Sequence, residues 1–282
     1  MSQVKIVTDS TAILSDEEIA QLDITVIPLT VVIDDVLYED GVTLSREEFM
    51  KKMGEANNIP KTSTPAIGAF SDVYERLTAD GSEVISIHLT PELSGTCQTA
   101  HQAAQLVSPD HIHVLNSTFI DRALGFQVIK AAKLAQTGAN AAEILAEMER
   151  TKQNTQLYLT LDSLDNLSAG GRISKATGFI GGLLNIKIGA HVVDGDIIAE
   201  VKGRGAKTIR NYIDKIIDEM HATQGIEMIG LSHAGIPEKA TELGARLAQE
   251  FPDATIAINQ TSPVVATHTG AGAYGLSYLV KG

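Results

Sequence analysis

The sequence contains no tryptophan and a single cysteine, Cys97, among its 282 residues. Aromatic residues contribute only 4% of the chain, so the core must be packed mainly with aliphatic side chains. One cysteine excludes an internal disulfide and is typical of proteins from a reducing compartment. Cys97 falls at the start of an expected helix, where we interpret it as a small core residue rather than a nucleophile.

Positive charge is also scarce. The chain carries 22 lysines and arginines against 35 acidic residues, a net charge of −13. Because affinity for nucleic acid depends on neutralising phosphates, we expect no nucleic-acid partner. No apolar run approaches the roughly 18 residues needed to cross a bilayer, and no signal segment opens the sequence. We therefore expect a cytoplasmic protein, and no residue pattern predicts a metal or another cofactor.

Apolar residues, by contrast, make up 44% of the chain and recur in short runs that alternate with amphipathic segments. In the first half this alternation predicts a mainly parallel sheet with helices on both faces. A polar stretch at 151–154 follows a charged helix end, and we place a domain boundary there. The predicted fold class is α/β, with a three-layer domain over 1–154 and a second α/β domain over 155–282 that holds a smaller mixed sheet and helices.

Polar motifs follow three of the expected strands of the first half: Thr8-Asp9-Ser10, Ser94-Gly95-Thr96 and Asn116-Ser117. Carboxyl ends of parallel strands meet at one edge of a sheet, which is where open α/β sheets bind ligands. The same residues also have a structural interpretation, as turn formers and helix caps.

The motif Ser94-Gly95-Thr96 lies between an expected strand at 84–89 and an expected helix at 97–107. A strand, a glycine-bearing loop and a helix can aim backbone N–H groups and hydroxyls at an anion. A second cluster, Thr62-Ser63-Thr64-Pro65, precedes another amphipathic segment and is expected at a helix N-terminus. A helix N-cap requires only one side-chain hydroxyl, whereas this cluster has three, so capping alone does not explain all of them.

Basic residues gather between positions 172 and 210, where seven lysines and arginines face three acidic residues, a net charge of +4. In a chain of net charge −13 this excess predicts a surface for a partner. The alternative is a set of scattered, solvated side chains.

Five motifs in order along the chain resemble the DegV family, fatty-acid-binding proteins that include the FakB-type subunit of bacterial fatty acid kinase. They are Thr8-Asp9-Ser10, Thr62-Ser63-Thr64-Pro65, Ser94-Gly95-Thr96, Gly170-Gly171-Arg172-Ile173 and His268-Thr269-Gly270-Ala271-Gly272. The chain departs from the usual family pattern at Thr64, Ala271 and Asn116, where glutamine, proline and aspartate are common.

The resemblance implies that a long-chain fatty acid such as palmitate is buried between the two domains. Its carboxylate would be held by Thr62, Ser94 and His268, and four further residues would lie close by: Ser63, Gly95, Thr96 and Thr269. For the acyl tail we consider Ile27, Leu29 and the segment 178–184.

By the same resemblance, Arg172 and Arg204 would meet an ATP-binding, FakA-type kinase subunit. That partner would phosphorylate the bound acid to an acyl-phosphate for phospholipid synthesis, and transient contact with a membrane surface is compatible with this role. The chain has no Walker-type phosphate loop. We therefore expect a lipid-binding protein that carries substrate and is not itself an enzyme.

Two other functions remain open from the residues alone. A serine hydrolase could use Ser94, His268 and Asp9, although the Gly-x-Ser-x-Gly elbow is missing around Ser94. A module that binds a phosphate ligand could use the hydroxyl and glycine loops. A deep aliphatic cavity would favour the fatty acid, and a shallow polar cleft would favour the phosphate.

Overall fold

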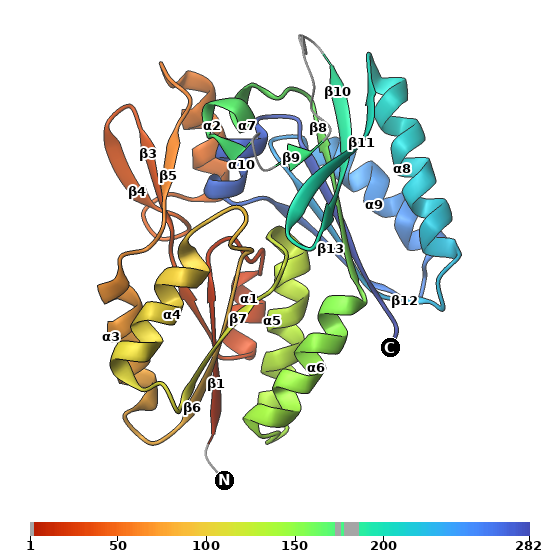
Figure 1. Cartoon of the computed structure of the whole chain (residues 1–282). Coiled ribbons are helices and arrows are strands. Elements are labelled where there is room, and N and C mark those ends of the chain that lie inside the picture. The colour runs from red at the N-terminus through yellow and green to blue at the C-terminus, as the bar shows by residue number, and fades with distance from the viewer. Residues whose placement is uncertain (1–2, 173–175, 178–185) are drawn as a thin grey trace.

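The computed structural model describes residues 3–172, 176–177 and 186–282 (Figure 1). These residues form a four-stranded sheet, a seven-stranded sheet and a three-stranded sheet, flanked by helices. None of the helices in these ranges combines the length and the apolar character required to span a lipid bilayer.

The four-stranded sheet is entirely parallel and runs in the order β2-β1-β6-β7, as the alternating sequence predicts. Its strands are β1 (Val4–Asp9), β2 (Ile24–Ile27), β6 (Glu83–His88) and β7 (Ile112–Asn116). One face is covered by α3 (Ile67–Thr78) and α4 (Thr96–Val107). The other face is covered by α1 (Asp16–Gln21), α5 (Asp121–Gln136) and α6 (Ala141–Gln153). The predicted three-layer arrangement is therefore confirmed.

The seven-stranded sheet is mixed and runs in the order β13-β12-β14-β8-β10-β11-β9. Its strands are β8 (Thr155–Leu161), β9 (Ala176–Thr177), β10 (Lys187–Val193), β11 (Asp196–Gly203), β12 (Ile226–His233), β13 (Thr255–Gln260) and β14 (Tyr274–Val280). Two helices, α8 (Ala206–His221) and α9 (Pro237–Glu250), cover part of one face.

Our expectation of a smaller sheet in the second half was wrong. The mixed sheet has more described strands than the parallel sheet because β14 inserts between β8 and β12 and joins the two groups of strands. Strands β10 and β11 form a hairpin, with its turn at Asp194-Gly195, a residue pair that favours such turns. The division at residue 154 stays a prediction; it falls between α6 and β8.

Helix α5 lies between the two larger sheets and contacts β1 on one side and β12 and β14 on the other. Its first two residues are both charged and both buried. Asp121 accepts hydrogen bonds from the hydroxyls of Ser232 and Thr261 in the second half of the chain. Arg122 donates to the Ile13 carbonyl at 2.7 Å and forms a two-point ion pair with Glu18. The helix is thus bonded to both halves of the chain.

The three-stranded sheet runs in the order β4-β3-β5 and consists of β3 (Thr30–Ile33), β4 (Val36–Glu39) and β5 (Lys61–Ser63). The predicted helix N-terminus at Thr62 was therefore wrong: Thr62 pairs with Val31, and α3 begins only at Ile67. A β-branched residue and a following Pro65 both favour extended backbone. Helix α2 (Arg46–Glu55) is capped by Ser45, whose hydroxyl accepts a hydrogen bond from the Glu48 amide.

Replacing Glu18 with glutamine should lower the free energy of unfolding by about 2–4 kcal/mol at pH 7, because it leaves the buried Arg122 without a carboxylate. Burial opposes ionisation of Glu18, but hydrogen bonds from Arg122 and Ser15 outweigh it and lower the pKa of its carboxyl. The stabilisation is therefore present above pH 4.5 and lost as the pH falls through this lowered pKa.

Urea denaturation of wild type and Glu18→Gln between pH 7 and pH 3 measures this effect. The matched control is Glu17→Gln, which removes the same charge from an exposed site on the same helix. Equal losses from the two variants would contradict a special role for the Arg122–Glu18 pair.

Candidate functional site

A cavity, partly open to solvent, lies where the three sheets approach one another. Most of its wall is aliphatic and comes from Leu29, Leu89, Leu93, Ile120, Leu159, Leu167, Ile197, Val264 and Val265. Its polar residues are Thr62, Ser63, Thr64, Ser94, Asp121, Arg172, His268 and Thr269. Thr62, Ser94 and His268, expected to converge, therefore share one cavity.

Thr62 and His268 are in direct contact although 206 positions separate them in the sequence. His268 lies in the last turn of α10 (Pro263–Thr269), which Ser262 caps by accepting the Val265 amide. Its Nε2 atom is 2.8 Å from the Thr62 hydroxyl, which projects from β5. Strand β5 and the end of α10 thus place a hydroxyl and an imidazole side by side.

The imidazole of His268 is electrically neutral at pH 7. Burial, assisted by the nearby positive charge of Arg172, lowers its pKa to about 4. Its Nδ1 atom is buried and has no hydrogen-bond partner among the described residues. A buried nitrogen without a hydrogen bond costs free energy, and this one lies against Gly170.

The turn at Gly170-Gly171-Arg172 leaves room for the imidazole ring of His268. A methyl group on Gly170 would overlap the His268 ring, and Gly171 has a positive φ of 73°. Arg172 then turns back, with Nε 3.1 Å from the Leu93 carbonyl oxygen and Nη1 2.8 Å from that of Gly170. The arginine thereby ties the turn at 170–172 to the loop that carries Ser94.

Ser94 reaches the cavity from the loop between β6 and α4. Its hydroxyl lies 2.9 Å from the hydroxyl of Thr96, which is fully buried as the first residue of α4. Gly95 is the N-cap, and its Cβ position would contact Thr64 at 3.6 Å. Gly95 and Thr96 therefore hold Ser94 in position but do not line the cavity themselves. Ser63 and Thr269 do line it.

The two arginines expected on a partner surface lie in different surroundings. Arg172 is half-buried and lines the cavity, whereas Arg204 is exposed in the turn between β11 and α8. Of the residues considered for an acyl tail, Leu29 lines the cavity. Ile27 does not, because its side chain packs under α3 and α4. The segment 178–184 lies outside the described residues.

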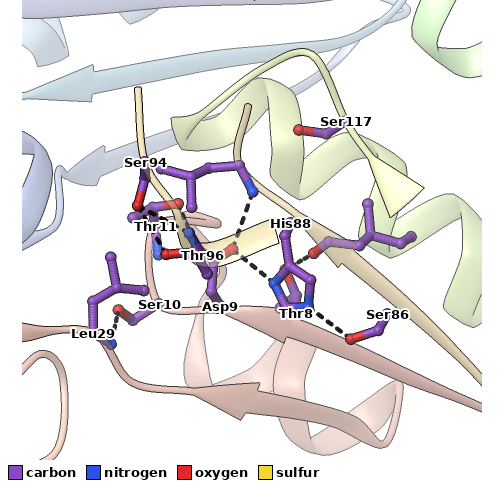
Figure 2. A network of polar contacts seen from close by, with 12 residues as sticks. Thr8, Asp9, Ser10, Thr11, Leu29, Ser86, His88, Ser94, Thr96 and Ser117 are labelled. Atoms are coloured by element: carbon purple, nitrogen blue, oxygen red, sulfur yellow. Dashed lines mark hydrogen bonds and ion pairs between the residues drawn. The ribbon is translucent and has the colours of Figure 1, made fainter. Parts of the chain in front are cut away.

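Beside this site, a buried carboxylate occupies the carboxyl edge of the parallel sheet (Figure 2). Asp9 Oδ1 accepts from the amide and the hydroxyl of Thr11, at 3.0 and 2.5 Å. Asp9 Oδ2 accepts from the Leu89 amide at 3.1 Å and lies 3.0 Å from His88 Nδ1. The other nitrogen of His88 lies 2.7 Å from the Ser86 hydroxyl. All these side chains are buried.

The sequence interpretation missed His88 as the partner of Asp9. Two features could have predicted this contact. His88 stands at the end of an apolar strand, and parallel pairing of β1 and β6 brings the ends of these two strands together. The rest of the Thr8-Asp9-Ser10 motif is also used internally. Thr8 donates to the Ile87 carbonyl, and Ser10 donates to Asp40 while accepting the Leu29 amide. The structural interpretation of this motif is therefore the better one.

Neither alternative function finds support in this geometry. A phosphate at the sheet edge would meet the buried Asp9, whose carboxylate already uses the amide and hydroxyl donors there. For a hydrolase, His268 bonds Thr62 and Ser94 bonds Thr96, while Asp9 faces His88. The Asp9–His88–Ser86 array resembles a triad in its order, but it is sealed from solvent.

Cysteine chemistry and metal binding also find no support among the described residues. Burial, together with the negative charge of Asp9, raises the pKa of Cys97 to about 11, so a reactive thiolate is disfavoured. In the part of the chain that the structure describes, no three histidine, cysteine or acidic side chains are grouped to hold a metal ion.

The lowered pKa of His268 makes a testable prediction for stability. Between pH 6.5 and pH 4 the unfolded chain binds a proton at this residue and the folded chain does not. Its contribution to the free energy of unfolding should therefore decrease as the pH falls through this range. Ring NMR signals of His268 should titrate near pH 4, and His268→Gln should lose less stability than wild type between pH 7 and pH 4. Titration near pH 6.5 would contradict the burial argument.

Comparison with known proteins places this geometry in context. Residues 3–281 match the family model described as "Uncharacterised protein, DegV family". A DegV domain-containing protein of Streptococcus pneumoniae (strain ATCC BAA-255 / R6) is 40% identical over 276 residues, 98% of each chain. DegV from Bacillus subtilis, a fatty acid binding protein, superposes with a TM-score of 0.91 at 33% identity over 100% of both chains.

A fatty-acid-binding DegV family protein from Thermus thermophilus superposes with a TM-score of 0.90 at 30% identity, over 99% of this chain and 100% of the other. Similarity in both sequence and fold thus extends over nearly the whole length of the chain, and not over a single shared motif. The chain belongs to the DegV family.

Proposed function

We propose that this protein binds a long-chain fatty acid in the cavity and presents it to a partner kinase. The observation that carries the proposal is one cavity with an aliphatic wall and a group of uncharged polar side chains, Thr62, Ser94 and His268. Such a cavity matches both parts of a fatty acid: an apolar tail and a carboxylate that must be hydrogen-bonded when buried. The acid would lie between the predicted domains 1–154 and 155–282.

The tail supplies most of the affinity. Burial of a methylene group contributes ~0.8 kcal/mol, so about fourteen methylenes contribute roughly 11 kcal/mol as an upper estimate. Leu29, Leu159 and Ile197 come from different parts of the chain and offer aliphatic contacts to such a tail. A phosphate or sugar ligand would make no comparable contact with this aliphatic wall of the cavity.

The polar residues position the head group. The Thr62 and Ser94 hydroxyls and an N–H of neutral His268 are donors, and each charge-assisted hydrogen bond contributes about 1.5–3 kcal/mol. The charge of Arg172 nearby favours an anion. Ser63 is a further candidate, and Gly95 and Thr96 hold Ser94 in place. Thr269 also lines the cavity, but its hydroxyl donates to the Val265 carbonyl at 3.0 Å.

Similar proteins support this class of ligand. The Bacillus subtilis and Thermus thermophilus relatives are fatty acid binding proteins, and a structure from Eubacterium ventriosum, with 27% identity and a TM-score of 0.88, is of a stearic acid-binding protein. These relatives share the fold whose sheets form the cavity described above.

The second part of the proposal is the partner. The chain has no Walker-type loop for ATP, so a phosphoryl donor would be supplied by an ATP-binding, FakA-type subunit in the cytoplasm. Exposed Arg204 is suited to contact with that subunit, while Arg172 lies close enough to the head-group residues to act on the carboxylate or its phosphate. In this arrangement the protein carries substrate and the partner performs the chemistry.

Removing the head-group hydroxyls should weaken binding of the fatty acid. Thr62→Val and Ser94→Ala should each lower affinity for palmitate or oleate by about 10–100-fold, because each removes one charge-assisted hydrogen bond. Native mass spectrometry and titration of the delipidated protein measure the effect. Thr241→Val, which removes an exposed hydroxyl on α9, is the matched control. Wild-type protein that retains no acyl chain and ignores added palmitate and oleate would overturn the proposal.

The partner role has a separate test. Arg204→Ala should slow formation of acyl-phosphate by an ATP-binding fatty acid kinase subunit about tenfold or more, while leaving affinity for the fatty acid unchanged. Lys133→Ala, an exposed cation on α5, should change neither. Unaltered acyl-phosphate formation by the Arg204 variant would refute its role as a partner contact.

A further inference from the structure

A second hollow, distinct from the cavity, lies on the opposite face of the mixed sheet. Helix α8 packs over β10 and β11, and α9 packs over β12 and β13, so the central strands β14 and β8 lie between the two helices (Figure 1). Where these strands are uncovered, a groove opens to solvent, with Thr160 and Tyr274 among its floor residues.

Each helix turns one regular face toward the groove. Helix α8 contributes Ala206, Ile209, Arg210 and Ile213, and α9 contributes Lys239, Glu242, Leu243 and Arg246. Both sets have the spacing i, i+3, i+4 and i+7, which defines a single helix face. The core face of α8 is formed by other residues, including Tyr212 and Ile216. The groove therefore presents aliphatic side chains, Ile209, Ile213 and Leu243, that are only partly buried, although Ile213 and Leu243 also pack against the core.

Cations predominate at the rim of the groove. Lys187, Arg210, Lys239 and Arg246 line it, against the acidic residues Asp162 and Glu242. Two of these cations have acidic partners: Lys187 pairs with Asp162 at 2.6 Å, and Arg246 pairs with Asp214 at 2.5 Å. Arg210 and Lys239 are exposed, on opposite walls, and remain to meet an incoming anion. Such an excess of cations is unexpected in a chain of net charge −13.

The Arg246–Asp214 pair joins α9 to α8, as does the contact of His221 with Glu250 at 2.7 Å, and these bridges close one end of the groove. At the other end lies Gly272, four residues beyond His268 in the loop that leads from the cavity to β14. The open end therefore adjoins the loop that follows His268 and leads to β14.

From these features we infer that the α8–α9 groove docks an amphipathic helix of a partner protein, with acidic side chains flanking an apolar stripe. Two helical walls with regular spacing, which carry partly exposed aliphatic side chains toward the space between them, are a geometry that can receive a helix in a groove. Arg210 and Lys239 on the two walls select acidic flanks. The inference does not depend on the proposed function, because it rests on the groove alone.

The test uses fluorescein-labelled, alanine-based helical peptides with leucine at i, i+4 and i+7. One peptide carries glutamate on both flanks, and its control carries lysine at the same positions. Fluorescence anisotropy should show that wild-type protein binds the glutamate peptide at least tenfold more tightly than the lysine peptide. The double variant Arg210→Glu/Lys239→Glu should lose about tenfold or more in affinity for the glutamate peptide.

A matched double variant, Lys51→Glu/Lys133→Glu, makes the same change of net charge on exposed residues of α2 and α5. It should alter affinity less than twofold. Equal losses from the two double variants would mean a diffuse electrostatic effect and would overturn the inference. Absence of binding by the glutamate peptide would also overturn it, as would binding of phosphatidylglycerol vesicles in its place through the same two residues.

Discussion

The whole arrangement depends on two buried, ionisable side chains at the start of α5, Asp121 and Arg122. Asp121 accepts hydrogen bonds from Ser232 and Thr261. Arg122 donates to Glu18 and to the backbone carbonyl of Ile13, which precedes α1. A buried charge without hydrogen bonds costs several kcal/mol, so neither half of the chain can move away from α5 without losing this compensation. The cavity has walls from both halves, and its shape therefore depends on these bonds.

A second constraint is the carboxylate of Asp9. Amide and hydroxyl donors at the carboxyl edge of a parallel sheet are suited to an anionic ligand, but here an internal anion takes them. The hydrogen-bond donors that remain available to a ligand lie elsewhere, where β5, the loop that carries Ser94 and the end of α10 meet. Those donors are uncharged, because burial keeps His268 neutral, and the positive charge beside them is that of Arg172. An acyl carboxylate with an aliphatic tail satisfies both the donors and the walls around them.

Sequence reasoning predicted the parallel sheet because β1, β6 and β7 are apolar runs that end in polar turns, a local pattern. The convergence of Thr62, Ser94 and His268 was predicted from their motifs, and the cavity confirms that they lie together. The strand at Thr62 was missed because its partner, Val31, is chosen by long-range pairing and not by local propensity. Bonds such as Asp9 to His88 depend on strand register, which one sequence does not reveal.

The position of β14 in the mixed sheet has a consequence for how the protein is made. This strand is far along the chain, yet it forms the middle of the sheet, paired with β8 on one side and β12 on the other. Until it is available, those two strands have unpaired backbone edges, which are prone to wrong associations. The mixed sheet therefore has to assemble after translation has passed residue 280, and a nascent chain waiting on the ribosome would be a natural client for a chaperone.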